Sequence, residues 1–263
     1  MYPFHRPEFF FYLISIVFLS FPPLHTHNYQ KVLLSNDKVD LIIHFKAVVN
    51  GEPLVFKKNY INSFNESFSV EKFRFYVGKI RLIHSGSNST TSFNQDDYFL
   101  VDFNDSSTTS IKISVEPDRY HQILFLLGVD SIHNVSGAQT GALDPLKGMF
   151  WTWNSGYVML KLEGISSISN QPAHALTYHI GGYREPNNTA KNIMIPFASG
   201  SELEIKNGNP NELTIFADIS KLFSGPHPIH IREIPTCTTP GPLAKSISEN
   251  YANMFTIKQI INP

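Results

Sequence analysis

The strongest constraint on the fold is an alternation of apolar and polar side chains with a period of two residues. The segment 40–49, which reads DLIIHFKAVV, shows it clearly. Leu41, Ile43 and Phe45 would share one face of an extended strand, and His44 would lie on the other. The segment therefore predicts a strand with one buried face.

A second alternating segment changes phase at a glycine. Phe73, Phe75 and Val77 occupy alternate positions, but after Gly78 the apolar positions move by one residue, so that Ile80 continues the series. An extra residue in one strand re-aims the following side chains, and glycine accommodates the backbone of such a β-bulge. We therefore predict a bulge at this glycine.

Further segments have the length and composition of strands. They are Tyr98–Phe103, Ile111–Val115, Gln122–Val129, Phe150–Glu163, Ala175–Ile180, Asn192–Pro196, Ser201–Ile205 and Glu212–Ile219. Short strands separated by turns rich in Asn, Gly and Pro favour an antiparallel β-sandwich or an open barrel. We expect a mostly β fold, an antiparallel β-sandwich with long loops, as one domain over residues 36–260. The predicted core contains Phe73, Phe75, Leu100, Phe125, Leu127, Val158 and Leu160.

One segment near the C-terminus has helical spacing instead. Leu243, Ile247, Tyr251 and Met254 recur at intervals of three or four residues, which places them on one face of a helix. Pro242 suits the first turn. Backbone N–H groups there have no acceptor within the helix, so the N–H that proline lacks is not missed. A short C-terminal helix is therefore predicted.

The composition excludes several classes of protein. Of 263 residues, 42% are hydrophobic and 13% aromatic, so the chain can bury a core and is not of the disordered type. Lys and Arg number 21 against 22 Asp and Glu, so there is no basic surplus for binding nucleic acid. Few charges beside many Ser, Thr and Asn residues are typical of secreted β proteins.

The N-terminus supports export. Residues 9–20 form an apolar run, FFFYLISIVFLS, which Pro22 and Pro23 end. The run is too short to span a membrane well but suits the apolar region of a secretory signal peptide. We expect residues 1–27 to be a signal peptide, no membrane span in the mature chain, and a periplasmic, cell-surface or secreted protein. A buried N-terminal strand or helix is the alternative.

No catalytic signature is present. The sequence contains no nucleophile elbow, no phosphate-binding glycine-rich loop and no zinc-protease helix motif, so we expect a protein that is not an enzyme. Cys237 is the single cysteine and cannot form an intramolecular disulfide. It is interpreted as a partly buried free thiol, with an intermolecular disulfide or a metal ligand as alternatives.

The densest group of unusual residues is the segment 148–164, GMFWTWNSGYVMLKLEG. Trp151 and Trp153 stand two apart, so a strand would send both to one face, and Tyr157 would extend that face. Two such residues most often fill a core. His179 lies in a following strand segment, TYHIGG, and by default is a hydrogen-bonded structural histidine. If the two segments pair as a hairpin, this histidine comes near the tryptophan face.

The order of these motifs resembles a known family. FRFYVGKIRL, YFLVDF, the run from LLGVDS to GMFWTWNSGYVMLKLEG, YHIGG and ENYANMF follow one another over residues 38–258. This pattern resembles the MbnP-like family of exported copper-binding proteins. The resemblance implies a β-sandwich involved in copper homeostasis. It also implies a tryptophan oxidised to kynurenine, with the oxidation attributed to a diheme cytochrome c peroxidase-like partner.

The resemblance also implies the metal ligands. His179 matches the histidine of the family's Tyr/Phe-His-x-Gly motif and is the first candidate, and His44 is the second. Trp151 or Trp153 would be the oxidised position, with Trp153 favoured because it is nearer the Asn-Ser-Gly turn. Imidazole suits copper, whereas intact indole offers no lone pair in the ring plane. Ring opening to kynurenine supplies an aniline nitrogen and a ketone.

Other interpretations stay open. The chain lacks the paired cysteines and the Met-rich C-terminal segment of some relatives, so His227, His230 and Cys237 are alternative ligands. The loop 131–147 and its flanks contain Asp130, Asn134 and Asp144, whose oxygens suit calcium but also stabilise turns. From another class of function, exposed Trp151, Trp153 and Tyr157 would form a surface for carbohydrate or protein.

Overall fold

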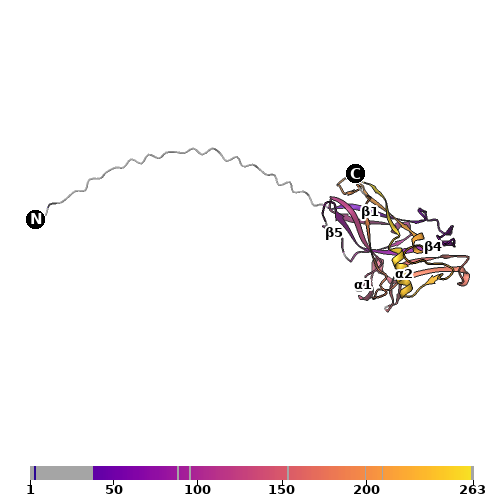
Figure 1. Cartoon of the computed structure of the whole chain (residues 1–263). Coiled ribbons are helices and arrows are strands. Elements are labelled where there is room, and N and C mark those ends of the chain that lie inside the picture. The colour runs from indigo at the N-terminus through magenta and orange to yellow at the C-terminus, as the bar shows by residue number, and fades with distance from the viewer. Residues whose placement is uncertain are drawn as a thin grey trace. The chain divides into compact units, whose positions relative to one another are not determined.

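The alternating segment that contains Phe45 lies at the centre of the first of two sheets (Figure 1). The computed structural model describes residues 3, 38–87, 89–94, 96–152, 154–198, 200–208 and 210–261. Contacts divide the chain into residues 1–35 and 36–263, and the second unit is described below. The predicted signal peptide lies outside the described residues apart from Pro3, as does Trp153.

The first sheet contains five strands among the described residues. In order they are β16 (Phe255–Ile261), β14 (Asn211–Asp218), β1 (Val39–Val49) and β2 (Glu52–Pro53), with β7 (Ser110–Val115) also paired to β1. The inward row of β1, including Ile43 and Phe45, is buried, while His44 on the other face is partly exposed. The prediction of a strand with one buried face is confirmed.

The second sheet faces the first and is larger. Its main order is β12 (Lys191–Pro196), β8 (Arg119–Leu127), β4 (Ser67–His84), β10 (Gly156–Ile165), β11 (Ala175–Gly181) and β15 (Thr236–Cys237). Five short strands pair with it: β3 (Asn59–Ile61), β5 (Thr90–Ser92), β6 (Tyr98–Asp102), β9 (Phe150–Thr152) and β13 (Leu203–Glu204). The predicted strand 150–163 is thus two strands, β9 and β10, joined by a turn.

The predicted phase change at Gly78 is confirmed. The pairing of β4 with β8 shifts between Gly78 and Arg81, and Lys79 takes a left-handed backbone conformation with φ 49°. The glycine also makes room for Tyr98, since a Cβ at this position would lie 2.5 Å from that ring. The bulge re-aims the second half of β4, so that Ile80 is buried as predicted.

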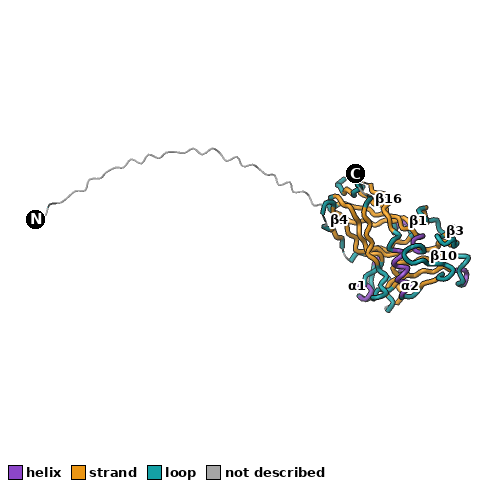
Figure 2. The backbone as a smooth tube through the Cα atoms, in the orientation of Figure 1, coloured by secondary structure: helices purple, strands orange, loops and turns teal. Residues whose placement is uncertain are grey.

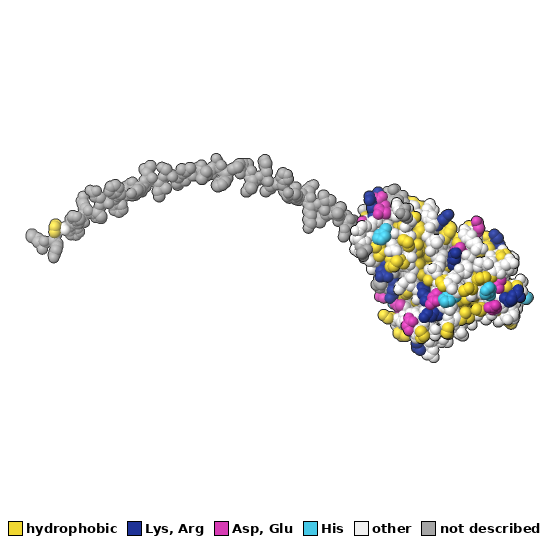
Figure 3. Space-filling model, in the orientation of Figure 1, with side chains coloured by type: hydrophobic (Ala, Val, Ile, Leu, Met, Phe, Trp, Pro, Cys, Tyr) yellow, Lys and Arg dark blue, Asp and Glu magenta, His cyan; other side chains and the backbone are white. Residues whose placement is uncertain are grey.

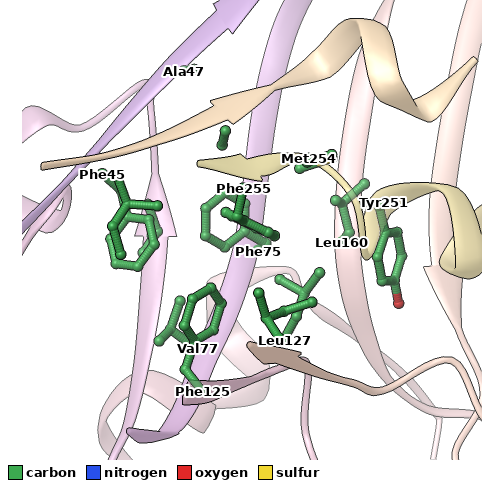
Figure 4. Packing of buried hydrophobic residues seen from close by; sticks show 14 of the residues in the cluster. Phe45, Ala47, Phe75, Val77, Phe125, Leu127, Leu160, Tyr251, Met254 and Phe255 are labelled. Carbon is green, nitrogen blue, oxygen red and sulfur yellow. The ribbon is translucent and has the colours of Figure 1, made fainter. Parts of the chain in front are cut away.

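Aromatic rings from both sheets fill the space between them (Figure 4). Phe45 of the first sheet lies 5.7 Å from Phe75 of the second, and Phe125 lies 5.2 Å from Phe255, both in edge-to-face geometry. Six of the seven predicted core residues are buried. Leu100 is only partly buried, and it lies with the buried Val158 on the outer face of the second sheet rather than between the sheets.

Two strand pairs depart from the antiparallel pattern. β1 pairs with β14 in parallel, and β11 pairs with β15 in parallel. The partners are far apart in sequence, so the chain reaches them by long connections rather than by hairpins. The other strand pairs among the described residues are antiparallel, and the mostly β sandwich is confirmed.

A second apolar cluster lies on the outer face of the larger sheet. It contains Tyr76, Tyr98, Leu126, Val129, Leu143, Met149, Tyr157, Val158, Met159 and Tyr183. The segment predicted as a loop, 131–147, covers part of this cluster and contains the short helix α1 (Ser131–Val135) and two single 3-10 turns. The outer face is therefore not a bare surface near Trp151, which packs against the same cluster.

The predicted C-terminal helix is confirmed as α2 (Pro242–Tyr251), with Pro242 in its first turn. Its inward residues Ile247 and Tyr251 are buried, and the Tyr251 hydroxyl donates a hydrogen bond to the Thr189 carbonyl. Figure 2 shows α1 and α2 toward one end of the domain, away from the C-terminus. Among the described residues, no helix has the length and apolar character needed to cross a membrane.

Candidate metal centre

His179 lies on the outer face of β11. Its neighbours Tyr178 and Ile180 point into the core between the sheets, so the alternation of the strand sends His179 the other way. Across the β10–β11 ladder it stands opposite Lys161. Its side chain is 19% exposed, which makes it a half-covered imidazole on the surface of the sheet.

Glu163 holds this imidazole in place. Its Oε1 lies 2.8 Å from Nε2 of His179, and its Oε2 lies 2.9 Å from the Lys72 ammonium on β4. Burial raises the pKa of the Glu163 carboxyl, but the hydrogen bonds from Lys72 and His179 outweigh it, and the pKa is lowered. Glu163 is therefore a carboxylate that bridges two strands.

The surroundings of the imidazole favour its neutral form. Burial lowers the pKa of His179, and the nearby Lys161 ammonium lowers it further, against the opposing effect of Glu163. A neutral ring keeps one nitrogen lone pair, which is what a metal ion requires. The chemistry of this histidine thus fits a ligand.

Trp151 lies over Gly181, which is on the same face of β11 as His179. A Cβ placed on Gly181 would be 2.7 Å from Cζ3 of the indole, so the ring lies directly over this glycine. Gly181 follows His179 by two residues, a separation of about 6.8 Å along a strand. The predicted pairing of the two segments is confirmed for β10 and β11, and it leaves Trp151 over Gly181, two residues along β11 from His179.

Two cations of the sheet anchor the segment that leads into Trp151. The guanidinium of Arg74 donates a hydrogen bond to the Lys147 carbonyl at 3.2 Å, and the ammonium of Lys161 donates one to the Gly148 carbonyl at 2.5 Å. Both carbonyls come at the end of a short 3-10 turn, directly before β9. These bonds hold the start of β9 against the outer face of β4 and β10.

His44 lies on the opposite side of the sandwich. It is on the outer face of the first sheet, where Nδ1 is 2.8 Å from the Ser110 hydroxyl and Nε2 is 3.4 Å from a Glu212 oxygen. His179 is on the outer face of the second sheet, and the aromatic core separates them. The structure therefore does not bring the two histidine candidates into one site.

Comparison with known families identifies the chain. The family model of MbnP matches residues 38–239, from the first residue before β1 to just after β15. The chain belongs to the MbnP family. MbnP from Methylosinus trichosporium, a solved structure, is 17% identical, with a TM-score of 0.48, and the match covers 71% of this chain and 78% of that one. No curated protein matches the sequence.

The other candidate ligands of this MbnP-family chain are engaged elsewhere. Cys237 is buried, and burial raises the pKa of its thiol to about 11, so it is not a ready thiolate. Nε2 of His227 lies 2.5 Å from a Glu249 carboxylate oxygen, and the His230 ring packs against Phe64 with the ring centres 4.1 Å apart and the planes tilted by 42°. Within the described residues, no three His, Cys, Asp or Glu side chains gather to hold a metal. The histidines visible in Figure 3 lie at separate points of the surface.

The predicted calcium donors serve the backbone of their own loop. Asp130 caps α1 by accepting from His133 N and also pairs with the Lys79 ammonium. The buried Asn134 side chain donates to two carbonyls and accepts from Tyr157 N, and Asp144 caps the turn before Gly148. Their oxygens stabilise turns in the manner of capping residues, and we do not propose a calcium site.

The alternative interpretation, an exposed aromatic surface, requires Tyr157 to be exposed, and this residue is buried. Tyr157 is only 1% exposed, and its hydroxyl donates a hydrogen bond to the Leu143 carbonyl at 2.7 Å. The prediction that Tyr157 is exposed for carbohydrate or protein binding is therefore wrong. The loop segment 141–150 covers it, which alternation in the strand alone does not reveal.

Proposed function

We propose that this MbnP-family chain is an exported copper-binding protein whose metal ligands are His179 and an oxidised Trp151. The observation that carries the proposal is the position of Trp151 over Gly181, two residues along β11 from the half-buried imidazole of His179, whose pKa burial lowers. Neutral imidazole suits copper in either oxidation state, and copper heads the affinity series of divalent metals, so few ligands suffice. The role in copper homeostasis is the one that the family resemblance implies.

Trp151 needs chemical change to take part. Intact indole has a single N–H donor and no in-plane lone pair. Opening the five-membered ring to kynurenine leaves an aniline nitrogen and a ketone oxygen, while the C2 carbon departs as formate. With water as the source of oxygen, the conversion releases four electrons and four protons, and we propose that a diheme cytochrome c peroxidase-like partner accepts the electrons. Trp153 stays a second candidate for the same change, because it stands two residues along the same segment.

Intact-mass measurement of the natively exported protein tests the modification. The change removes one carbon and adds one oxygen, and peptide mapping assigns it to a residue. Trp151→Phe should abolish the mass change, and Trp153→Phe should retain it. The reverse result would transfer the role to Trp153. An unmodified protein in a host that carries the partner would refute the oxidised ligand.

Copper binding tests the histidine. His179→Ala should weaken copper binding at least tenfold, whereas His44→Ala is the matched control, because it removes a carboxylate-paired histidine from the opposite face. Since binding stabilises the native state, the rise in melting temperature on adding copper should disappear only in His179→Ala. Equal copper affinity in the wild type and His179→Ala would overturn the assignment.

A further inference from the structure

The contact between Glu163 and His179 has a defined direction. A carboxylate can only accept a hydrogen bond, so at 2.8 Å the hydrogen must belong to Nε2 of the imidazole. In the neutral ring the other nitrogen, Nδ1, then carries the lone pair. Within the described part of the chain, no hydrogen bond reaches Nδ1.

We propose that Glu163 is a positioning residue that fixes His179 as the Nε2–H tautomer and thereby makes Nδ1 the metal-binding nitrogen. The proposal rests on the copper-binding function proposed above. A carboxylate on the far nitrogen of a ligating histidine fixes its orientation and raises its basicity, and loss of such a partner lowers metal affinity about 10–100-fold.

The strand register explains why Glu163 can do this. It is paired with Lys72 across the β4–β10 ladder, and it lies diagonally from His179 across the β10–β11 ladder. One carboxylate oxygen is therefore taken by the ammonium on one side and the other by the imidazole on the other side. With both oxygens engaged, the carboxylate cannot rotate away without losing a charged partner.

His44 offers a natural contrast. Its Nδ1 is bound to the Ser110 hydroxyl, and its Nε2 is 3.4 Å from Glu212, so neither nitrogen is left without a neighbour. A hydroxyl both donates and accepts, so this contact does not select a tautomer. Glu212→Gln is accordingly the matched control for Glu163 substitutions.

The tautomer can be measured on the metal-free protein. Long-range proton–nitrogen correlation spectra of protein labelled with 15N-histidine distinguish a protonated from an unprotonated ring nitrogen. We expect wild-type His179 to be a single Nε2–H tautomer and Glu163→Ala to show averaging between tautomers. Lys72→Met should give an intermediate result, and Glu212→Gln should match the wild type. Circular dichroism confirms that each variant is folded, and Glu163→Leu, which also removes the acceptor, replaces Glu163→Ala if the alanine variant unfolds.

Silver(I) ion then serves as a diamagnetic probe of the site. Its binding should shift the Nδ1 resonance of wild-type His179, and the affinity should fall about 10–100-fold in Glu163→Ala. A silver-induced shift at Nε2, or a tautomer and affinity that do not depend on Glu163, would overturn the positioning role. A failure of the proposed function looks different: His179 would be a single tautomer in the metal-free protein, yet neither copper nor silver would bind.

Discussion

The indole of Trp151 lies on Gly181, close enough that the smallest side chain would meet it: a Cβ at residue 181 would be 2.7 Å from Cζ3 of the ring. The Tyr157 carbonyl lies 2.6 Å from the same point. The glycine is thus the feature of β11 that allows a large aromatic ring to lie two residues from His179. The absence of a side chain at this one position of β11 is therefore what allows an indole to be part of the candidate site.

Gly181→Ala should displace Trp151. The indole must move, because the backbone carbonyl of Tyr157 leaves the new methyl group no other direction. We expect a loss of about 1–3 kcal/mol in unfolding free energy, as for other overpacked sites, and weaker copper binding. Thr177→Ala, on the same face of β11, is the control. Unchanged copper binding and an unchanged melting temperature in Gly181→Ala would contradict the described packing.

His179 should titrate below the ordinary histidine pKa of about 6.5. Burial and the Lys161 charge lower its folded pKa, so the unfolded chain binds the proton first as pH falls. Its contribution to stability is therefore complete above pH ~6.5 and declines as pH falls toward the folded pKa. Proton NMR titration should show the low midpoint, and Lys161→Gln should raise it. A wild-type midpoint at or above ~6.5 would contradict the described environment.

Glu66 should make the fold sensitive to acid. Burial raises the pKa of its carboxyl, but hydrogen bonds from Asn62 and the backbone N–H groups of Ile231 and Arg232 outweigh it, and the pKa is lowered. The stabilisation is present above the ordinary value of about 4.3 and is lost as pH falls through the folded pKa.

Urea unfolding at several pH values measures this effect. Glu66→Ala should cost about 1–3 kcal/mol at neutral pH, because it leaves buried N–H donors without an acceptor, and it should flatten the acid dependence. Glu71→Ala, which removes an exposed carboxylate from β4, should change stability by less than about 0.5 kcal/mol. Equal losses in both variants would argue against a special role for Glu66.

Phe75 should be essential to the core. It is fully buried and lies in edge-to-face contact with Phe45 and Phe255. Phe75→Ala should lower the unfolding free energy by about 3–5 kcal/mol, through lost burial and the cavity left behind. Met194→Ala, at a residue 62% exposed, should cost less than about 0.5 kcal/mol. Chemical denaturation compares the two, and a small loss in Phe75→Ala would place the core elsewhere.

Local patterns predicted the elements of this protein well. Alternation gave the strands around Phe45 and Phe75, the phase change gave the bulge at Gly78, and the spacing after Pro242 gave the helix. These features depend on neighbours within a few residues, where side-chain direction follows directly from backbone geometry. The tryptophan and histidine segments could also be paired in advance, because they lie close together in the chain.

The candidate site depended on contacts that no local pattern contains. No local pattern singles out Glu163 as the partner of His179, and Lys72 comes from a strand about ninety residues earlier in the chain. The alternative interpretation placed Tyr157 on an exposed surface, yet the segment 141–150 folds over it. A period of two says which side chains share a face, but it does not say what covers that face.

The sequence by itself determined that this chain forms strands, that one of them has a bulge at Gly78, and that His44 leaves the core. Only the tertiary structure decided that His44 and His179 lie on opposite faces of the sandwich, because the sheet that a strand joins depends on pairing between distant segments. The parallel pairing of β1 with β14 and the register of β10 between β4 and β11 set those faces. They also bring Glu163 and Trp151 to His179 and leave His44 with Ser110 and Glu212.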